Sequence, residues 1–396
     1  MNKNIKLAVA GAVLALSATA NAGIIIPAGE WTLDVNGNVN AFGTYVKGKG
    51  VNTTASGTNA GGIATPAQAH EDQTQGINTG LLPTWLGFTG TTRQNDVDVS
   101  FTISMQPNVS DNTAAGDNNT PLFRQSFLTF GDKSWGSIKL GKDIGIFASD
   151  AILNDMTLLG VGGAAGSSGT ATTLGGIGTG YIYAAWKGQI AYTTPNMNGF
   201  QATVGITNPN QSAEGNVAGL YQDRFGIEAK ASYAFSGDMA SGKLWVSGAS
   251  NDVTYGGLGQ SYTASVADIG LNLNAGNLGL TGYYYTGEGV GTTVFGNLAS
   301  DGAGNKRDSD GGYLQATYVL PTKTKLGIAY GTSNLDRANA ADVNVISKNE
   351  RVTIGAYHPL TKHLNLVAEY NDIESRVHNG DKGESQSGSL GAILFF

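Results

Sequence analysis

Cysteine is absent from this chain of 396 residues, so neither a disulfide framework nor a thiolate metal site can form. Beyond the first 22 residues, no uninterrupted apolar run approaches the ~20 residues that a membrane-crossing helix needs, which excludes a helical membrane protein. Proline is also scarce, with 9 residues, whereas the 59 glycines amount to about twice the usual frequency of ~7%. Abundant glycine and 16 tyrosines with little proline favour many strands and turns over helices.

The first 22 residues have the organisation of a secretory signal peptide. Lys3 and Lys6 provide a basic beginning, 7–18 form a short apolar stretch, and 20–22 supply the small residues that signal peptidase requires. We therefore expect the mature chain to begin at Gly23. Cleavage removes two of the 23 basic residues and none of the 30 acidic ones, which changes the formal net charge from −7 to −9. This acidic balance argues against a nucleic-acid partner.

Apolar and polar residues alternate in many segments of the mature chain. Between 97 and 106, Phe101 and Ile103 alternate with Thr102 and Ser104. Similar segments lie at 31–45, 225–235, 267–274, 351–356 and 364–370. A period of two is typical of a strand with two different faces, and charged residues on one face indicate that this face contacts water.

Short and long connections alternate along the chain. The short, turn-like links are Gly90–Asp96, Gly131–Gly136, Thr193–Gly199, Asn274–Asn277, Leu320–Lys323 and His358–Lys362, and the long polar stretches are 48–80, 107–121, 144–182, 208–222, 251–262, 287–311, 332–349 and 373–386. This layout predicts a transmembrane antiparallel β-barrel of about 16 strands, with short periplasmic turns and long external loops. We expect one all-β domain over 23–396, embedded in outer-membrane lipids.

The barrel predicts which way each side chain points. The apolar set, Trp31, Leu33, Val35, Phe101, Ile103, Phe225 and Ile227, should face lipid or a subunit interface, and the polar set, Asn36, Asn38, Thr102, Glu228 and Lys230, should face the lumen. A soluble β-sandwich or β-solenoid also alternates, but this chain is long for a sandwich and its loops vary too much for a solenoid. The last residues favour the membrane barrel, because Leu394 and Phe396 continue the alternation to the end of the chain.

Three motifs resemble the Gram-negative general porins, a family of trimeric sixteen-stranded barrels. Trp135–Lys142 resembles the family's W-G-x-x-x-L-G-R strand, 190–195 with Gly199-Phe200 resembles its I-x-Y-x-[ST]-P…G-F hairpin, and Leu394–Phe396 resembles its C-terminal strand. The resemblance implies passive diffusion of small hydrophilic solutes and ions through a water-filled lumen. It also implies a homotrimer, and an assembly signal at Phe396 that the barrel-assembly machinery reads.

The resemblance further implies a pore constriction, because the third external loop of porins folds into the lumen and faces basic residues on the opposite wall. Here that loop, 143–182, carries Asp143, Asp150 and Asp155. The candidate basic partners are Arg124, Lys139, Lys142, Lys187 and Arg351. The chain departs from the family at Trp85, where many relatives have arginine, and the acidic P-E-[FW]-G-G-D loop motif is missing. These departures indicate a different charge and width at the constriction.

Other classes of protein remain as alternatives. A substrate-selective porin would have the same fold, and a barrel with a plugged lumen would serve a structural role. An outer-membrane lipase would need a serine nucleophile with a histidine base, and none of the four histidines, His70, His358, His363 and His378, lies amid a catalytic cluster. The acidic stretch 301–310 does not have the spacing of an EF-hand loop. We therefore expect no catalytic residues, no metal and no cofactor.

Overall fold

The computed structural model describes residues 23–50, 63–64, 73–109, 122–163, 172–209, 220–221, 224–255, 260–301 and 303–396. The expected signal peptide, 1–22, lies outside these residues. The strands are β1 (Ile24–Ala28), β2 (Trp31–Gly50), β3 (Gln73–Asn78), β4 (Trp85–Gln94), β5 (Val97–Gln106), β6 (Leu122–Asp132), β7 (Gly136–Ile144), β8 (Trp186–Thr193), β9 (Phe200–Thr207), β10 (Leu220–Tyr221), β11 (Gly226–Ser236), β12 (Ser241–Tyr255), β13 (Gln260–Ala275), β14 (Leu278–Glu288), β15 (Asp308–Val319), β16 (Lys325–Leu335), β17 (Ile346–Pro359), β18 (Leu364–Val377) and β19 (Lys382–Phe395). Two short helices, α1 (Ser149–Leu153) and the 3-10 helix η3 (Met156–Leu159), lie between β7 and β8. Within the described ranges, no helix has the length and hydropathy needed to cross a membrane.

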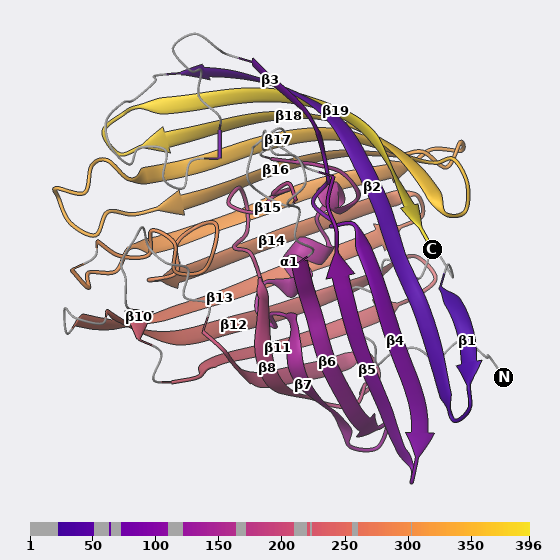
Figure 1. Ribbon diagram of the computed structural model, residues 1–396. Coiled ribbons are helices and arrows are strands. Elements are labelled where there is room, and N and C mark those ends of the chain that lie inside the picture. Colours follow the sequence, from indigo (N-terminus) through magenta and orange to yellow (C-terminus); the bar gives the residue numbers. More distant parts are fainter. Residues whose placement is uncertain are drawn as a thin grey trace, which may run out of the picture.

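The strands form one antiparallel sheet that closes on itself where β19 pairs with β2. Three short strands lie in line with longer ones: β1 continues the edge of β2 that β19 occupies, β3 and β4 pair along successive parts of β2, and β10 and β11 pair along β12. The described residues therefore form a closed 16-stranded barrel, which confirms the all-β prediction. Figure 1 shows β1, the first described strand, near the C-terminus at one end of this barrel.

The two faces of the sheet differ as the alternation predicts. On β5 and β11, Ile103 and Ile227 point outward with exposed fractions of 49% and 56%. Their inward neighbours are polar, and Glu228 is 1% exposed inside the barrel. A continuous outer belt of exposed apolar side chains is what a hydrocarbon environment favours, whereas a soluble protein would bury such residues.

One of the short turns, between β4 and β5, is shorter than the sequence predicts. We expected a turn over Gly90–Asp96, but β4 extends to Gln94 and only Asn95 and Asp96 connect it to β5. These two residues have φ angles of 48° and 63°. Two successive left-handed residues are the requirement of a tight hairpin turn, and asparagine and aspartate tolerate this conformation better than most residues.

Two of the predicted external loops are instead mostly strand. The stretches 251–262 and 373–386 extend the hairpins β12–β13 and β18–β19, which leave only 256–259 and 378–381 as connections. Lys382 bridges Glu374 on the neighbouring strand with an N–O separation of 3.4 Å. The outer face of these strand ends is polar, whereas apolar side chains such as Val253 and Ile373 are buried on the inner face, so the apolar-out pattern that marks a membrane-facing strand is lost although the backbone ladder continues.

Candidate pore constriction

In the segment between β7 and β8, the described residues 145–163 and 172–185 enter the barrel instead of extending away from it, and Figure 1 shows α1 inside the barrel. Phe147, Ala151 and Tyr181 of this segment are buried in one apolar cluster with Trp245 and Tyr313 of the barrel wall. The Tyr313 hydroxyl also donates to the Ala151 carbonyl at 2.8 Å. Because buried apolar packing resists displacement, the segment is fixed to the wall formed by β12–β15.

Two wall glutamates bind the backbone of this segment. Glu228 on β11 accepts hydrogen bonds from the Ile146 and Phe147 amides at 2.7 and 2.9 Å. Glu369 on β18 accepts from the amides of 161 and 162 at 2.9 and 2.8 Å, and from the Tyr357 hydroxyl at 2.7 Å. Charge-assisted hydrogen bonds to backbone amides are stronger than neutral ones, so these two carboxylates determine where the segment crosses the lumen.

Asp150 lies in the first turn of α1 and contacts two lysines of the wall. Its carboxylate oxygens are 2.8 Å from Lys230 Nζ on β11 and 2.5 Å from Lys243 Nζ on β12. Burial alone would favour the protonated acid, but the two ammonium groups outweigh burial and hold the pKa of Asp150 below its ordinary value of 3.8. The carboxylate is therefore ionised at neutral pH, and it shares its charge between two cations.

Asp155 organises the second half of the segment. Its carboxylate caps η3 by accepting from Thr157 N at 2.9 Å, and it also accepts from Gly176 N at 2.9 Å and the Tyr181 hydroxyl at 2.8 Å. Burial, together with this neighbouring carboxylate, raises the pKa of Tyr181 well above 10, so its phenol remains a hydrogen-bond donor. Arg351 on β17 approaches the same carboxylate at 3.8 Å, which brings two predicted site residues together.

Asp143 lies at the end of β7 and not in the loop, and it faces inward beside Lys139. The two side chains form an ion pair, and Asp143 also accepts from Gln125 Nε2 at 2.8 Å. Lys187 is directly opposite Asp143 in the β7–β8 register, but its ammonium pairs with Glu228 at 2.6 Å. Thus all three predicted residues lie on the inner side of the wall near the entry of the loop.

Lys142 is separated from this group. It is three residues from Lys139 on the same strand, so the two side chains point to opposite faces of the sheet. Lys142 is exposed on the outer face, and its ammonium donates to the Phe123 carbonyl at 2.9 Å. The structure therefore does not bring Lys142 together with the other candidates.

Arg124 near the start of β6 contacts aromatic residues. Its guanidinium lies 5.9 Å from the ring centre of Trp186, and the Trp186 ring is 6.1 Å from that of Trp85. Trp85 on β4 and Trp186 on β8 are separated by three intervening strands, so their rings can only meet on the concave inner side of the barrel. This contact places Trp85, which distinguishes the chain from the general porins, at the same level as the loop.

Sequence reasoning missed four residues that hold the loop: Lys243, Lys230, Glu228 and Glu369. Alternation predicted that the side chains of Lys230 and Glu228 point into the lumen, but it does not identify which loop atom a wall residue contacts. The loop carboxylates were expected to face cations across the lumen, whereas Asp150 and Asp155 contact theirs directly. In the described part of the chain, no three His, Cys, Asp or Glu side chains gather closely enough to hold a metal ion.

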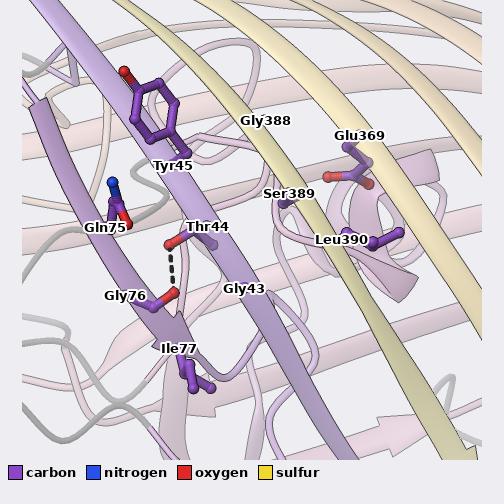
Figure 2. Close-up of a pocket in the computed structure, with 10 residues that line it drawn as sticks. All are labelled: Gly43, Thr44, Tyr45, Gln75, Gly76, Ile77, Glu369, Gly388, Ser389 and Leu390. Carbon is purple, nitrogen blue, oxygen red and sulfur yellow. Dashed lines mark hydrogen bonds between the residues drawn. The ribbon is translucent and has the colours of Figure 1, made fainter.

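Apart from the lumen, a hollow lies on the outside of the barrel, at the seam where the barrel closes. Gly43 on β2 and Gly388 on β19 leave space beside Tyr45 and Leu390, and the hollow has a volume of about 680 Å³. Figure 2 shows the residues around it, including the hydrogen bond from Thr44 Oγ1 to the carbonyl oxygen of Gly76, on β3. This hollow is open and belongs to the outer belt, so it is not the path through the barrel.

A closed β-barrel with an apolar outer belt and a loop fixed across its lumen defines the class of outer-membrane channels. A family model described as Gram-negative porin matches residues 7–378, and the chain belongs to this family. The protein is therefore an outer-membrane diffusion channel and not an enzyme.

Solved structures show the same fold at low sequence identity. The outer membrane channel DcaP of Acinetobacter baumannii is similar with a TM-score of 0.71 and 15% identity, covering 93% of this chain and 99% of that one. An anion-selective porin from Comamonas acidovorans is similar with a TM-score of 0.64 and 17% identity, covering 93% of this chain and 100% of that one. OmpF of Salmonella typhi is similar with a TM-score of 0.60 and 16% identity, covering 94% of this chain and 100% of that one. A comparison with curated protein sequences finds no match.

Proposed function

We propose that this channel admits small hydrophilic solutes and ions by passive diffusion with a preference for anions, and that segment 145–185 bounds its narrowest part. The observation that carries the preference is the contact of both Lys230 and Lys243 with the single carboxylate of Asp150. This cluster keeps a net positive charge, and 34% of the Lys243 side chain is exposed. Charges at the narrowest part of a pore determine which ions pass.

Two further cations support this preference. Within the described ranges, the charged groups of Arg124 and Lys325 contact the rings of Trp186 and Tyr357 instead of carboxylates. Their positive charges are therefore not neutralised by a neighbouring acid. The Comamonas porin of the same fold is anion-selective, which agrees with the proposal.

The residues proposed to line the constriction are those that lie on the inner side at the level of the loop. They are Arg124, Lys139, Asp143, Asp150, Asp155, Lys187 and Arg351, to which the contacts add Lys230 and Lys243. Lys142 is left out because its side chain is on the outer face.

Reversal potentials in planar bilayers under a salt gradient test the anion preference. Lys243→Gln should lower the anion-to-cation permeability ratio by about two- to fivefold, because removing one unit charge a few ångströms from the ion path changes the energy by about 0.5–1 kcal/mol in water-like surroundings. Lys142→Gln is the matched control and should leave the ratio unchanged. A cation-selective wild type, or a Lys243→Gln variant with an unaltered ratio, would contradict the proposal.

We also propose that the protein is a homotrimer. A trimer form of OmpT, an outer membrane protein of Vibrio cholerae, has the same fold with a TM-score of 0.53 and 13% identity, covering 92% of this chain and 99% of that one. The exposed apolar belt provides surface for both lipid and neighbouring subunits. Native mass spectrometry of the detergent-extracted protein tests this assignment, and a monomer stable at all concentrations would oppose it.

Export is proposed to proceed through cleavage before Gly23, followed by insertion by the barrel-assembly machinery. The strand β1 begins at Ile24 and pairs with β2, so the barrel uses the chain almost from the proposed cleavage point. N-terminal sequencing of the protein from outer membranes should read Gly23-Ile24-Ile25. A longer N-terminus would show that the signal is retained or cut elsewhere.

A further inference from the structure

Three cation–aromatic pairs lie on the inner side of the barrel. Arg124 contacts Trp186 at 5.9 Å, Lys139 contacts Phe127 at 4.8 Å, and Lys325 contacts Tyr357 at 5.0 Å, measured from the cation to the ring centre. Phe127 and Trp186 are half-buried, so part of each ring faces the lumen, whereas Tyr357 is buried. Arg124 and Trp186 therefore present a positive charge and an aromatic surface side by side, whereas at Phe127 the charge of Lys139 is paired with Asp143 and the ring supplies mainly apolar surface.

The loop contributes apolar surface to the same space. Its acidic side chains are covered, since Asp150 and Asp155 are 3% and 5% exposed. Among the described residues on or beside the loop, the side chains that stay half-buried are mostly apolar, namely Leu82, Leu153, Leu159, Leu174 and Tyr183. Because the loop lies inside the barrel, the exposed part of these side chains faces the lumen and not the lipid.

We propose that the channel favours organic anions with an apolar body, such as aromatic and short aliphatic carboxylates, over hydrophilic anions of similar size. The carboxylate of such a solute is attracted by Arg124, while its body contacts Trp186, Phe127 and the loop leucines. Arg124 lies where it can pair with the carboxylate while the adjacent Trp186 ring covers hydrocarbon. This inference rests on the proposed anion preference and specifies which anions benefit from it.

Other solutes use only part of this surface. A hydrophilic anion such as gluconate gains the attraction of the cations but must lose water from its hydroxyl groups beside leucine side chains, which offer no hydrogen bonds. A neutral apolar solute gains the hydrophobic contact but not the charge. A sugar can stack on the aromatic rings, but it carries no negative charge for Arg124 beside Trp186 to attract.

Bi-ionic reversal potentials with sodium benzoate or sodium gluconate against sodium chloride test the proposal on the full-length protein in planar bilayers. In the wild type, the benzoate-to-gluconate permeability ratio should exceed the ratio of their mobilities in water by about fivefold, equivalent to ~1 kcal/mol. Trp186→Leu and Phe127→Leu should each lower the benzoate-to-chloride ratio more than the gluconate-to-chloride ratio. Trp186→Phe, which keeps a ring, should retain most of the preference.

The controls separate this inference from the proposed function. Trp135→Leu changes an exposed aromatic residue of a turn and should leave all ratios as in the wild type. If chloride is preferred over sodium but benzoate and gluconate follow their mobilities, the inference fails while the anion preference stands. An equal fall of the benzoate-to-chloride and gluconate-to-chloride permeability ratios in the leucine variants would also overturn the inference. Heat-dependent migration on gels reports whether each variant folds. If Trp186→Leu does not fold, the permeability ratios of Phe127→Leu test the inference instead.

Discussion

Asp150 is one carboxylate that serves two lysines from different strands, and its replacement tests the charge balance of the lumen. Asp150→Asn removes the negative charge but keeps the size of the side chain. The anion-to-cation permeability ratio should rise about two- to fivefold, by the same electrostatic argument that applies to Lys243 and with the opposite sign. Reversal potentials under a salt gradient measure it. Asp238→Asn, in the exposed turn between β11 and β12, is the control and should have no effect.

The ionisation of Asp150 also predicts how the channel responds to acid. Because the pKa of Asp150 is lowered in the folded protein, the ion pairs stabilise the docked loop fully above about pH 4 and are lost as the pH falls through the folded-state pKa, which is below 3.8. The contribution of Asp150 to ion selectivity should therefore be constant between pH 7 and pH 4, and its loss should shift the selectivity toward anions only in more acidic solution. The wild-type reversal potential as a function of pH measures this. A shift near pH 6 would assign the titration to another group.

At the level of single residues, the sequence predicts charges better than it predicts their partners. Asp150, Asp155 and Arg351 were identified as candidates from the resemblance to porins, and the structure places all three where the loop meets the wall. Lys243 was not identified, because a period of two gives the face of a strand but no distance to a loop that folds back from elsewhere. Lys142 was identified from the resemblance, in which it occupies the place of the arginine in W-G-x-x-x-L-G-R, although its odd spacing from Lys139 puts it on the other face.

The strands predict a difference in stability between neighbouring positions. Ile103→Lys on β5 would place an ammonium in the apolar outer belt, while Thr102→Lys would place it in the water-filled lumen. The first change should lower the free energy of unfolding by ~2–4 kcal/mol and the second by much less, because only the first removes a charge from water. Denaturant unfolding of the protein in phospholipid vesicles compares the two variants. Similar losses at both positions would be incompatible with a membrane-spanning orientation of β5.

Strand positions were easier to predict than strand ends. The segments with one apolar face, such as 97–106, are strands as expected. The ends of β12, β13, β18 and β19 were assigned to loops, because strands that continue beyond the apolar belt have no lipid face and their outer side chains are polar. The interior position of 145–185 could not be derived from its own composition, since small and apolar residues are equally compatible with other conformations. It was expected only because of the family.

We expect assembly of the whole barrel to depend on its last residue. The Phe396 amide donates to the Gly37 carbonyl at 3.0 Å, and the Gly37 amide donates to the Phe396 carbonyl at 2.7 Å. Deletion of Phe396 removes both bonds at the closing seam and also the aromatic end that we propose as the assembly signal. Outer-membrane fractions should contain much less folded protein than those of the wild type, as judged by heat-dependent gel migration. Phe396→Tyr, which keeps the ring, should assemble normally, and normal assembly of the deletion would contradict the assigned signal.

The closing seam also brings the two ends of the mature chain together. Gly23 lies against Asp34, and Phe396 forms hydrogen bonds with Gly37. Asp34 and Gly37 are three residues apart on β2, which in an extended strand is only about 10 Å. A short glycine linker could therefore join the ends without crossing the lumen. New ends could then be opened in a connection such as 378–381, which joins β18 and β19. The geometry of this barrel is thus compatible with circular permutation, in which the order of the strands in the gene changes while their order around the wall stays the same.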